Sequence, residues 1–96
     1  MATPGETFTM HGGEQLTFSA FVLGLASSAL IHLGVHQNPE TGSVNVDLIS
    51  ARQSIDVLAL LREKTRGNLS AEEEQLFSSV LADLRLRFVE KSNSKA

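Results

Sequence analysis

The chain has 96 residues, of which 42% are hydrophobic and 20% charged, and a formal net charge of −3 at pH 7. This length corresponds to one small domain, and the absence of cysteine excludes disulfides, thiolate metal sites and a cysteine nucleophile. Before Arg52 the chain has no Lys or Arg, and from there on basic and acidic residues are interspersed. This distribution disfavours nucleic acid as a partner, because nucleic-acid binders usually carry a basic excess on one face.

Residues 1–15 contain three glycines, one proline and scattered polar side chains without periodicity, which predicts a disordered arm. Residues 92–96 are equally polar and predict a flexible tail. A single helical domain is therefore expected over residues 16–91. The acids that precede the first apolar run do not fit the positive start of a secretory signal, so we expect a cytoplasmic location.

The first helix is expected to begin with Thr17 or Ser19 as its N-cap and to end near Gly34. Its apolar residues surround most of the helix axis, and no formal charge lies between Leu16 and Val35. Twenty residues of this kind can span a bilayer. The hydroxyls and the histidine in this stretch, and the lack of flanking Lys or Arg, favour burial within protein instead.

One strip of this helix carries small residues, and its Gly24-x-x-x-Ser28 spacing would let another backbone approach closely. A monomeric three-helix domain could hardly cover all the apolar faces of such a helix. We therefore expect self-association as a homodimer or larger oligomer, with packing through Phe21, Gly24, Leu25 and Ser28. Peripheral membrane or lipid-ligand binding through the same helix is the alternative.

After a loop marked by Asn38-Pro39 and Gly42, a second helix is predicted from about Asp47 to about Thr65. Its apolar residues recur at three- and four-residue spacing: Leu48, Ala51, Ile55, Leu58 and Leu61. Three further apolar residues widen this stripe and suggest a second partner for the helix: Ile49, Val57 and Leu60.

A third helix is predicted from Ser70 to about Lys91, with an apolar stripe of Leu76, Phe77, Val80, Leu81, Leu84 and Phe88. No strand-like alternation of useful length is found, apart from the short stretch 43–46. The predicted fold class is all-α. The second and third helices form an antiparallel hairpin, the first packs against it, and the domain packs as a symmetric oligomer.

His32 and His36 have the spacing of two metal ligands on one helix. A zinc site needs further ligands, and the nearest carboxylate, Glu40, lies beyond Pro39. We expect these imidazoles to satisfy the last carbonyls of the first helix instead. No metal or other cofactor is predicted.

Asp56 and Asp83 are single acids in otherwise apolar helical surroundings, and paired carboxylates would suit general acid–base catalysis. The sequence does not place them together. Arg52 and Asp56 have the i,i+4 spacing of a pair on the edge of the second helix, and we expect each acid to pair at an interhelical edge with an arginine such as Arg52, Arg85 or Arg87. No phosphate loop, nucleophile elbow or His-Glu-x-x-His motif occurs. The prediction is a non-enzymatic interaction or assembly module.

The stretch EKTRGNLSAEEE, residues 63–74, has two interpretations. As a connector, it places Gly67 where the end of a helix needs a left-handed residue, and Ser70 and Glu73 match a capping box. As an anion or nucleotide site, it offers Lys64, Arg66 and Asn68 beside the free amides of a helix N-terminus. The glutamates at 72–74 would repel a phosphate, which favours the connector.

Four stretches occur in order along the chain: FVLGLASSALIHLG (21–34), IDVL (55–58), EKTRGNLS (63–70) and LRLRF (84–88). Together they resemble a family of small bacterial proteins catalogued only as a domain of unknown function, over about residues 16–90. The most specific part is the Lys-Thr-x-Gly-Asn-Leu core at 64–69, and the aromatic residue that closes the pattern, often Tyr, is Phe88 here. The resemblance implies a bacterial, cytoplasmic, helical protein and supplies no catalytic residues.

Overall fold

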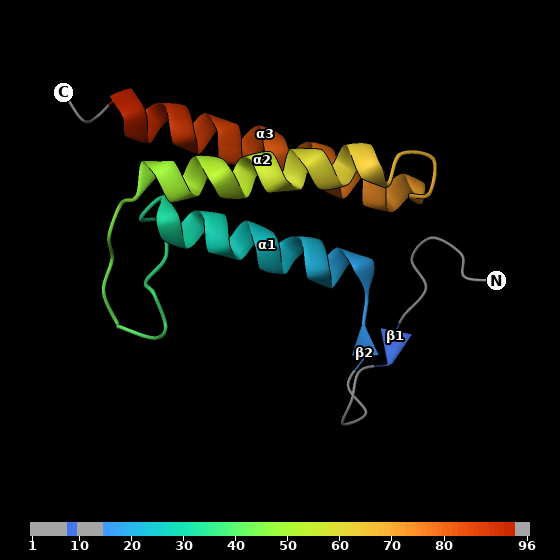
Figure 1. The fold of residues 1–96 in the computed structure, drawn as a ribbon, viewed down its shortest axis with the longest axis horizontal. Helices are drawn as coiled ribbons and strands as arrows, with labels where there is room; N and C mark the ends of the chain where they lie inside the picture. The colour runs from blue at the N-terminus through green and yellow to red at the C-terminus, as the bar shows by residue number, and fades with distance from the viewer. Residues whose placement is uncertain (1–7, 10–14, 94–96) are drawn as a thin grey trace.

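The computed structural model describes residues 8–9 and 15–93. Its elements, in chain order, are β1 (Phe8–Thr9), β2 (Gln15–Leu16), α1 (Phe18–His32), α2 (Leu48–Lys64) and α3 (Ala71–Asn93). In Figure 1 the three helices lie side by side, with α1 and α3 running in one direction and α2 in the other. This arrangement confirms the predicted all-α domain with an antiparallel pair of α2 and α3.

The helices begin at residues whose side chains can accept a hydrogen bond from the first turn. Thr17, rather than Ser19, caps α1, because its Oγ1 accepts from the N–H of Ala20 at 3.0 Å. Asp47 caps α2 in the same way, with Oδ1 accepting from the N–H of Ser50 at 3.1 Å. The last helix, α3, continues to Asn93, which is two residues into the predicted tail. Residues 94–96 lie outside the described part of the chain.

A two-residue antiparallel ladder pairs Phe8 with Leu16 and Thr9 with Gln15. It lies mostly within the arm that was predicted to be disordered, where no alternation of side chains indicated strands. The other residues of that arm, 1–7 and 10–14, lie outside the described part of the chain.

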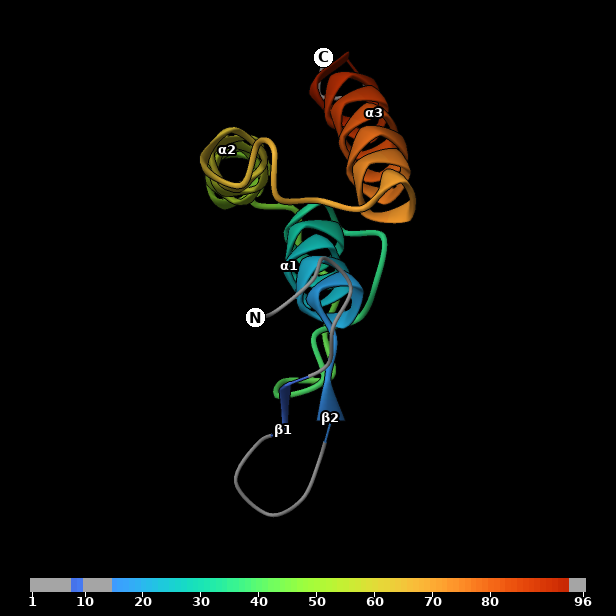
Figure 2. The same cartoon turned by 90° about the vertical axis from the view of Figure 1, so that its right-hand side faces the viewer.

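Each helix contributes one buried stripe to a common core. The buried apolar residues are Val22, Ala26, Ala29 and Leu33 on or next to α1, Ala51, Ile55 and Leu58 on α2, and Phe77, Leu81 and Leu84 on α3. Seen along the helix axes, α1 lies beneath the gap between α2 and α3 (Figure 2). Phe77 is fully buried, and its ring centroid is 5.8 Å from that of Phe18, so α3 is anchored to the beginning of α1.

The loop from α1 to α2 is closed at its base, where the N–H of Asp47 donates to the carbonyl of His32 at 2.7 Å. Gly34 has φ +77°, and a Cβ at this position would lie 2.7 Å from Cγ2 of Val46. Only glycine fits both the conformation and the space. Gly34 therefore ends α1, as predicted, and lets the returning chain pack against the helix end.

Candidate functional site

The turn between α2 and α3 has the geometry that the connector interpretation predicted. Gly67 has φ +86°, in the left-handed region that favours glycine. The Oγ of Ser70 accepts from the N–H of Glu73 at 3.1 Å, and Oε1 of Glu73 accepts from the N–H of Ser70 at 2.9 Å. This reciprocal capping box satisfies two amides that a helix start leaves unpaired.

Glu73 is also more buried than the sequence indicated, with only 4% of its surface exposed. Its second oxygen, Oε2, is buried and has no hydrogen-bond partner among the described residues. The capping-box pattern predicted the role of Oε1 but gave no sign of this burial, because burial depends on the neighbouring helices.

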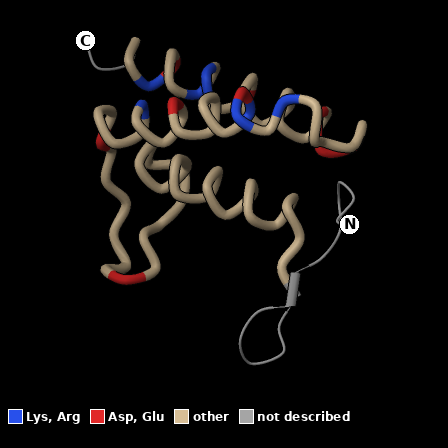
Figure 3. The backbone as a smooth tube through the Cα atoms, turned by 45° about the vertical axis from the view of Figure 1, so that its right-hand side comes forward, with Lys and Arg blue, Asp and Glu red and all other residues tan. Residues whose placement is uncertain are grey.

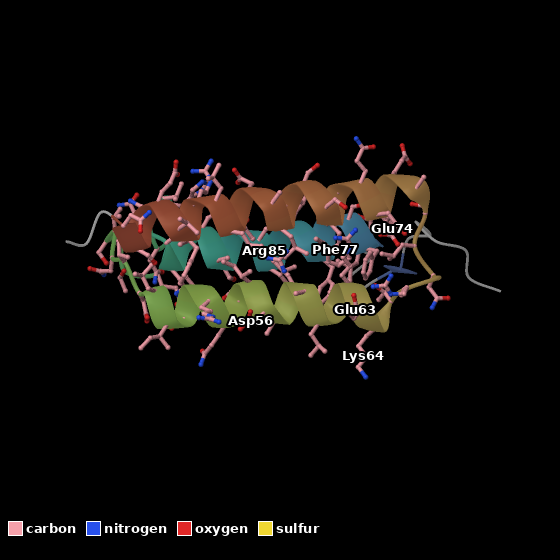
Figure 4. All side chains as sticks on the ribbon, turned by 90° about the horizontal axis from the view of Figure 1, so that it is seen from above. Asp56, Glu63, Lys64, Glu74, Phe77 and Arg85 are labelled. Carbon is pink, nitrogen blue, oxygen red and sulfur yellow. The ribbon has the colours of Figure 1, made fainter. Side chains whose placement is uncertain are left out.

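The three residues proposed for an anion site do not converge on one place. Arg66 forms an ion pair with Glu63, in which Nη2 of Arg66 donates a hydrogen bond to Oε2 of Glu63. This hydrogen bond raises the pKa of the Arg66 guanidinium. Lys64 projects from α2 on the side away from α3 (Figure 4). Asn68 is exposed in the turn, and its backbone N–H donates to the carbonyl of Thr65. Of the three, Arg66 lines a hollow between α2 and α3.

A groove runs between α2 and α3 on the side opposite α1, and we call it the α2–α3 groove. It contains two hollows of about 400 and 220 Å³, both lined by Arg85. Figure 4 looks into this groove and shows Arg85 between the two helices. The lining residues recur at helical spacing: Arg52, Ile55, Asp56, Ala59, Arg62 and Glu63 on α2, Arg66 in the turn that follows it, and Glu74, Leu81, Arg85, Phe88 and Val89 on α3.

Ion pairs engage most of the charges along this groove. Arg62 reaches across from α2, with Nη2 3.6 Å from Oε1 of Glu74 and donating to Oγ of Ser78 at 2.8 Å. Arg52 lies 4.0 Å from Asp56, and Glu63 pairs with Arg66. Within residues 15–93, no acid pairs with Arg85, so it is the cation left over in the groove.

The two acids considered for catalysis lie in different ion pairs. Asp56 pairs with Arg52, and Oδ2 of Asp83 accepts from Nε of Arg87 at 2.9 Å. Both pairs lie within one helix at four-residue spacing, as the sequence indicated for Arg52 and Asp56, whereas Asp83 was expected to pair at an interhelical edge. Pairs within one helix form readily because residues four apart are neighbours on the helix surface.

The residues predicted for self-association lie along one side of α1, beside its buried stripe. Phe21, Gly24 and Ser28 are exposed, and Leu25 is half-buried and packs against the core. We call this surface the outer α1 face. Leu25 and Ser28, together with His32, line a hollow of about 380 Å³ whose other wall is α2.

The outer α1 face continues onto α2 through exposed apolar side chains. Val57 lines the same hollow as Leu25, and Ile49 and Leu60 are exposed on α2 to 76% and 58%. These are the residues that widened the predicted stripe, and all three remain exposed in the described part of the chain. Figure 3 shows that α1 carries no Lys, Arg, Asp or Glu, whereas α2 and α3 carry both signs.

His32 and His36 were the residues considered as metal ligands, and His32 lies near Asp47, whose backbone N–H donates to the His32 carbonyl. Within residues 8–9 and 15–93, no group of three or more His, Asp or Glu could hold a metal ion. Over the same residues, no helix is both long enough and apolar enough to cross a membrane. The 15 residues of α1 span about 22 Å, against about 30 Å for the hydrocarbon core of a bilayer.

Residues 15–90 match the model of a protein family described as a domain of unknown function, DUF1844. No curated protein and no solved structure matches the chain significantly. The family description assigns no activity.

Proposed function

We propose that the chain, which belongs to the DUF1844 family, is a non-enzymatic assembly module that associates with a second copy of itself through the outer α1 face. The observation that supports this proposal is the one-sided burial of α1. One stripe of the helix lies in the core, while Phe21, on the outer α1 face, remains 43% exposed. Burial of apolar surface yields about 25 cal/mol per Å², so a partner that covers this face would be stabilising.

The charge distribution favours an identical copy as the partner. A two-fold symmetric contact brings the same patch of both subunits together, so any charge in its centre would meet its like. The outer α1 face carries no formal charge, and the neighbouring exposed residues Ile49, Val57 and Leu60 are also uncharged. Lys64 follows one turn after Leu60 and would lie at the rim.

The small residues on this face would let two copies of α1 approach closely. Gly24 and Ser28 lie one turn apart, and a Cβ at Gly24 would meet nothing within 4 Å in the single chain. Close backbone approach increases the van der Waals contact between two helices, and the shallow hollow beside Leu25 offers room for an apolar side chain of the partner.

The other functions considered for these surfaces receive less support. A lipid surface could also cover the outer α1 face, but α1 has no Lys or Arg to attract anionic lipids. An anion or nucleotide at the α2–α3 turn would meet Glu72 and Glu74, while Lys64 projects elsewhere. A bacterial cytoplasmic setting belongs to the same proposal and rests on the family resemblance seen in the sequence.

Light scattering coupled to size exclusion tests the proposal at micromolar concentration. We expect a mass of at least twice the 10.4 kDa of the chain. Gly24→Glu should yield a monomer, because it places a bulky charge in the centre of the contact. The single chain has space for this side chain, and a helix tolerates Glu better than Gly, so the variant should still fold.

Ala82→Glu is the matched control, since Ala82 is exposed on α3 and lies outside the outer α1 face. It should retain the mass of the unmodified chain. A clean monomer for the unmodified chain would contradict self-association. Flotation of the chain with liposomes would instead indicate that a lipid surface covers the face.

A further inference from the structure

We propose that the α2–α3 groove binds an acidic amphipathic helix of a partner protein, with Arg85 pairing to one of its carboxylates. The groove lies on the opposite side of α2 and α3 from α1, so this inference does not depend on self-association through the outer α1 face. It rests on the shape of the groove, on the chemistry of its walls and on Arg85. Among the described residues, Arg85 is the lining cation that forms no ion pair with an acid.

The length of the groove suits a short helix. Its lining on α3 extends from Glu74 to Val89, which is about 22 Å at 1.5 Å per residue. A partner helix of about four turns has the same length. Such a helix would lie along α2 and α3 as a fourth helix, on the side that α1 leaves open.

The walls of the groove favour a helix over an extended peptide. Both walls are helices, whose backbone N–H and C=O groups are bonded along their own axes, so they offer no free strand edge. An extended peptide would find no backbone partners there. A helix satisfies its own backbone and binds through side chains alone, as amphipathic helices do in apolar grooves.

The floor of the groove supplies the apolar part of the contact. Ile55 and Leu81 lie there as core residues, exposed to 5% and 2%, and Phe88 and Val89 continue the lining toward the end of α3. Val89 is 52% exposed, so apolar surface is left for a partner to cover. The partner helix should therefore present aliphatic side chains to this floor.

The charges set the sign of the partner. Asp56, Glu63 and Glu74 each already have an arginine within 4.0 Å, and Arg85 is the lining cation without an acid among residues 15–93. Because Arg85 lines both hollows, it lies near the middle of the groove. A carboxylate from the partner would pair with it, whereas a lysine there would meet a like charge.

Two synthetic peptides provide the probe for this proposal. The first is a four-turn amphipathic helix with leucine on one face and glutamate beside it, and the second has glutamine in place of every glutamate. Amide chemical shifts of the isotope-labelled chain are followed during titration with each. We expect the glutamate peptide to shift amides of the groove, such as those of Ala59, Leu81 and Phe88. The glutamine peptide should bind about two- to fivefold more weakly.

Arg85→Gln should reduce the affinity for the glutamate peptide to that of the glutamine peptide. Arg87→Gln is the matched control, because it removes the same charge two residues away from a side chain that pairs with Asp83 rather than lining the groove. It should bind the glutamate peptide as the unmodified chain does. Arg85 is exposed, so the variant should retain its melting temperature.

Three outcomes would overturn the inference. The first is that the groove amides do not shift at millimolar glutamate peptide. The second is equal binding of both peptides, or no effect of Arg85→Gln. The third is that the groove amides shift when the chain alone is concentrated, since the occupant would then be a second copy. If the unmodified chain proves to be a monomer, self-association through the outer α1 face is contradicted. The peptide measurements still test the groove, because it lies on the opposite side of the bundle.

Discussion

At the scale of single residues, two glycines with positive φ differ in the space around them. Substituting both therefore distinguishes the stability lost through backbone conformation from the stability lost through steric crowding. A Cβ at Gly67 would meet no atom within 4 Å, whereas a Cβ at Gly34 would lie 2.7 Å from Cγ2 of Val46. Gly67→Ala should therefore lower the free energy of unfolding by about 1–2 kcal/mol through conformation alone. Gly34→Ala should lower it further, because the loop must also shift. Urea denaturation measures both, and equal losses would contradict the crowding argument.

Also at this scale, Asp47 makes stability depend on pH. Hydrogen bonds from the backbone and side chain of Ser50 hold the pKa of Asp47 below its ordinary value of 3.8. The folded state thus favours the carboxylate, and the resulting stability is present above about pH 3.8 and lost as pH falls through the lower folded pKa. Asp47→Asn keeps a capping oxygen but no charge. The difference in free energy of unfolding between the unmodified chain and Asp47→Asn should shrink below about pH 3.8. A difference that stays constant with pH would show that Asp47 is not the group responsible.

At the scale of the elements, the start of α3 depends on the reciprocal bonds between Ser70 and Glu73. Ser70→Ala should lower the free energy of unfolding by about 1 kcal/mol, because the N–H of Glu73 loses its acceptor. Glu73→Gln is a milder change, since a glutamine oxygen can still accept from the N–H of Ser70. Chemical denaturation measures the free energy of unfolding of both variants, and Ser70→Ala should lose more than Glu73→Gln. An unchanged free energy of unfolding for Ser70→Ala would show that the cap does not stabilise the chain.

The helix boundaries could be predicted to within about two residues, because caps such as Thr17, Asp47 and Ser70 act on their own first turn. The α2–α3 groove could not be predicted in this way. The sequence offered Arg85 as a partner for Asp56 or Asp83, whereas its position between two hollows depends on how far apart α2 and α3 pack. The short ladder of β1 and β2 had no signal at all, since two-residue strands are too short to show alternation.

At the scale of the whole molecule, the two proposed contacts use opposite sides of the bundle. The outer α1 face is uncharged and apolar, while the α2–α3 groove carries paired charges and, among the described residues, one arginine without an acid. A chain with both contacts could join a partner helix to a second copy of itself. Gly24→Glu should therefore abolish self-association without changing the affinity for the glutamate peptide, and Arg85→Gln should do the reverse.

The arrangement of α1, α2 and α3 fixes where the described chain enters and leaves the bundle. α1 begins at the end that holds the α2–α3 turn, and α3 finishes at the opposite end, beside the α1–α2 loop (Figure 1). The 23 residues of α3 cover about 35 Å. Asn93 is thus held about that far from the turn, so α3 acts as a spacer between the two ends of the bundle.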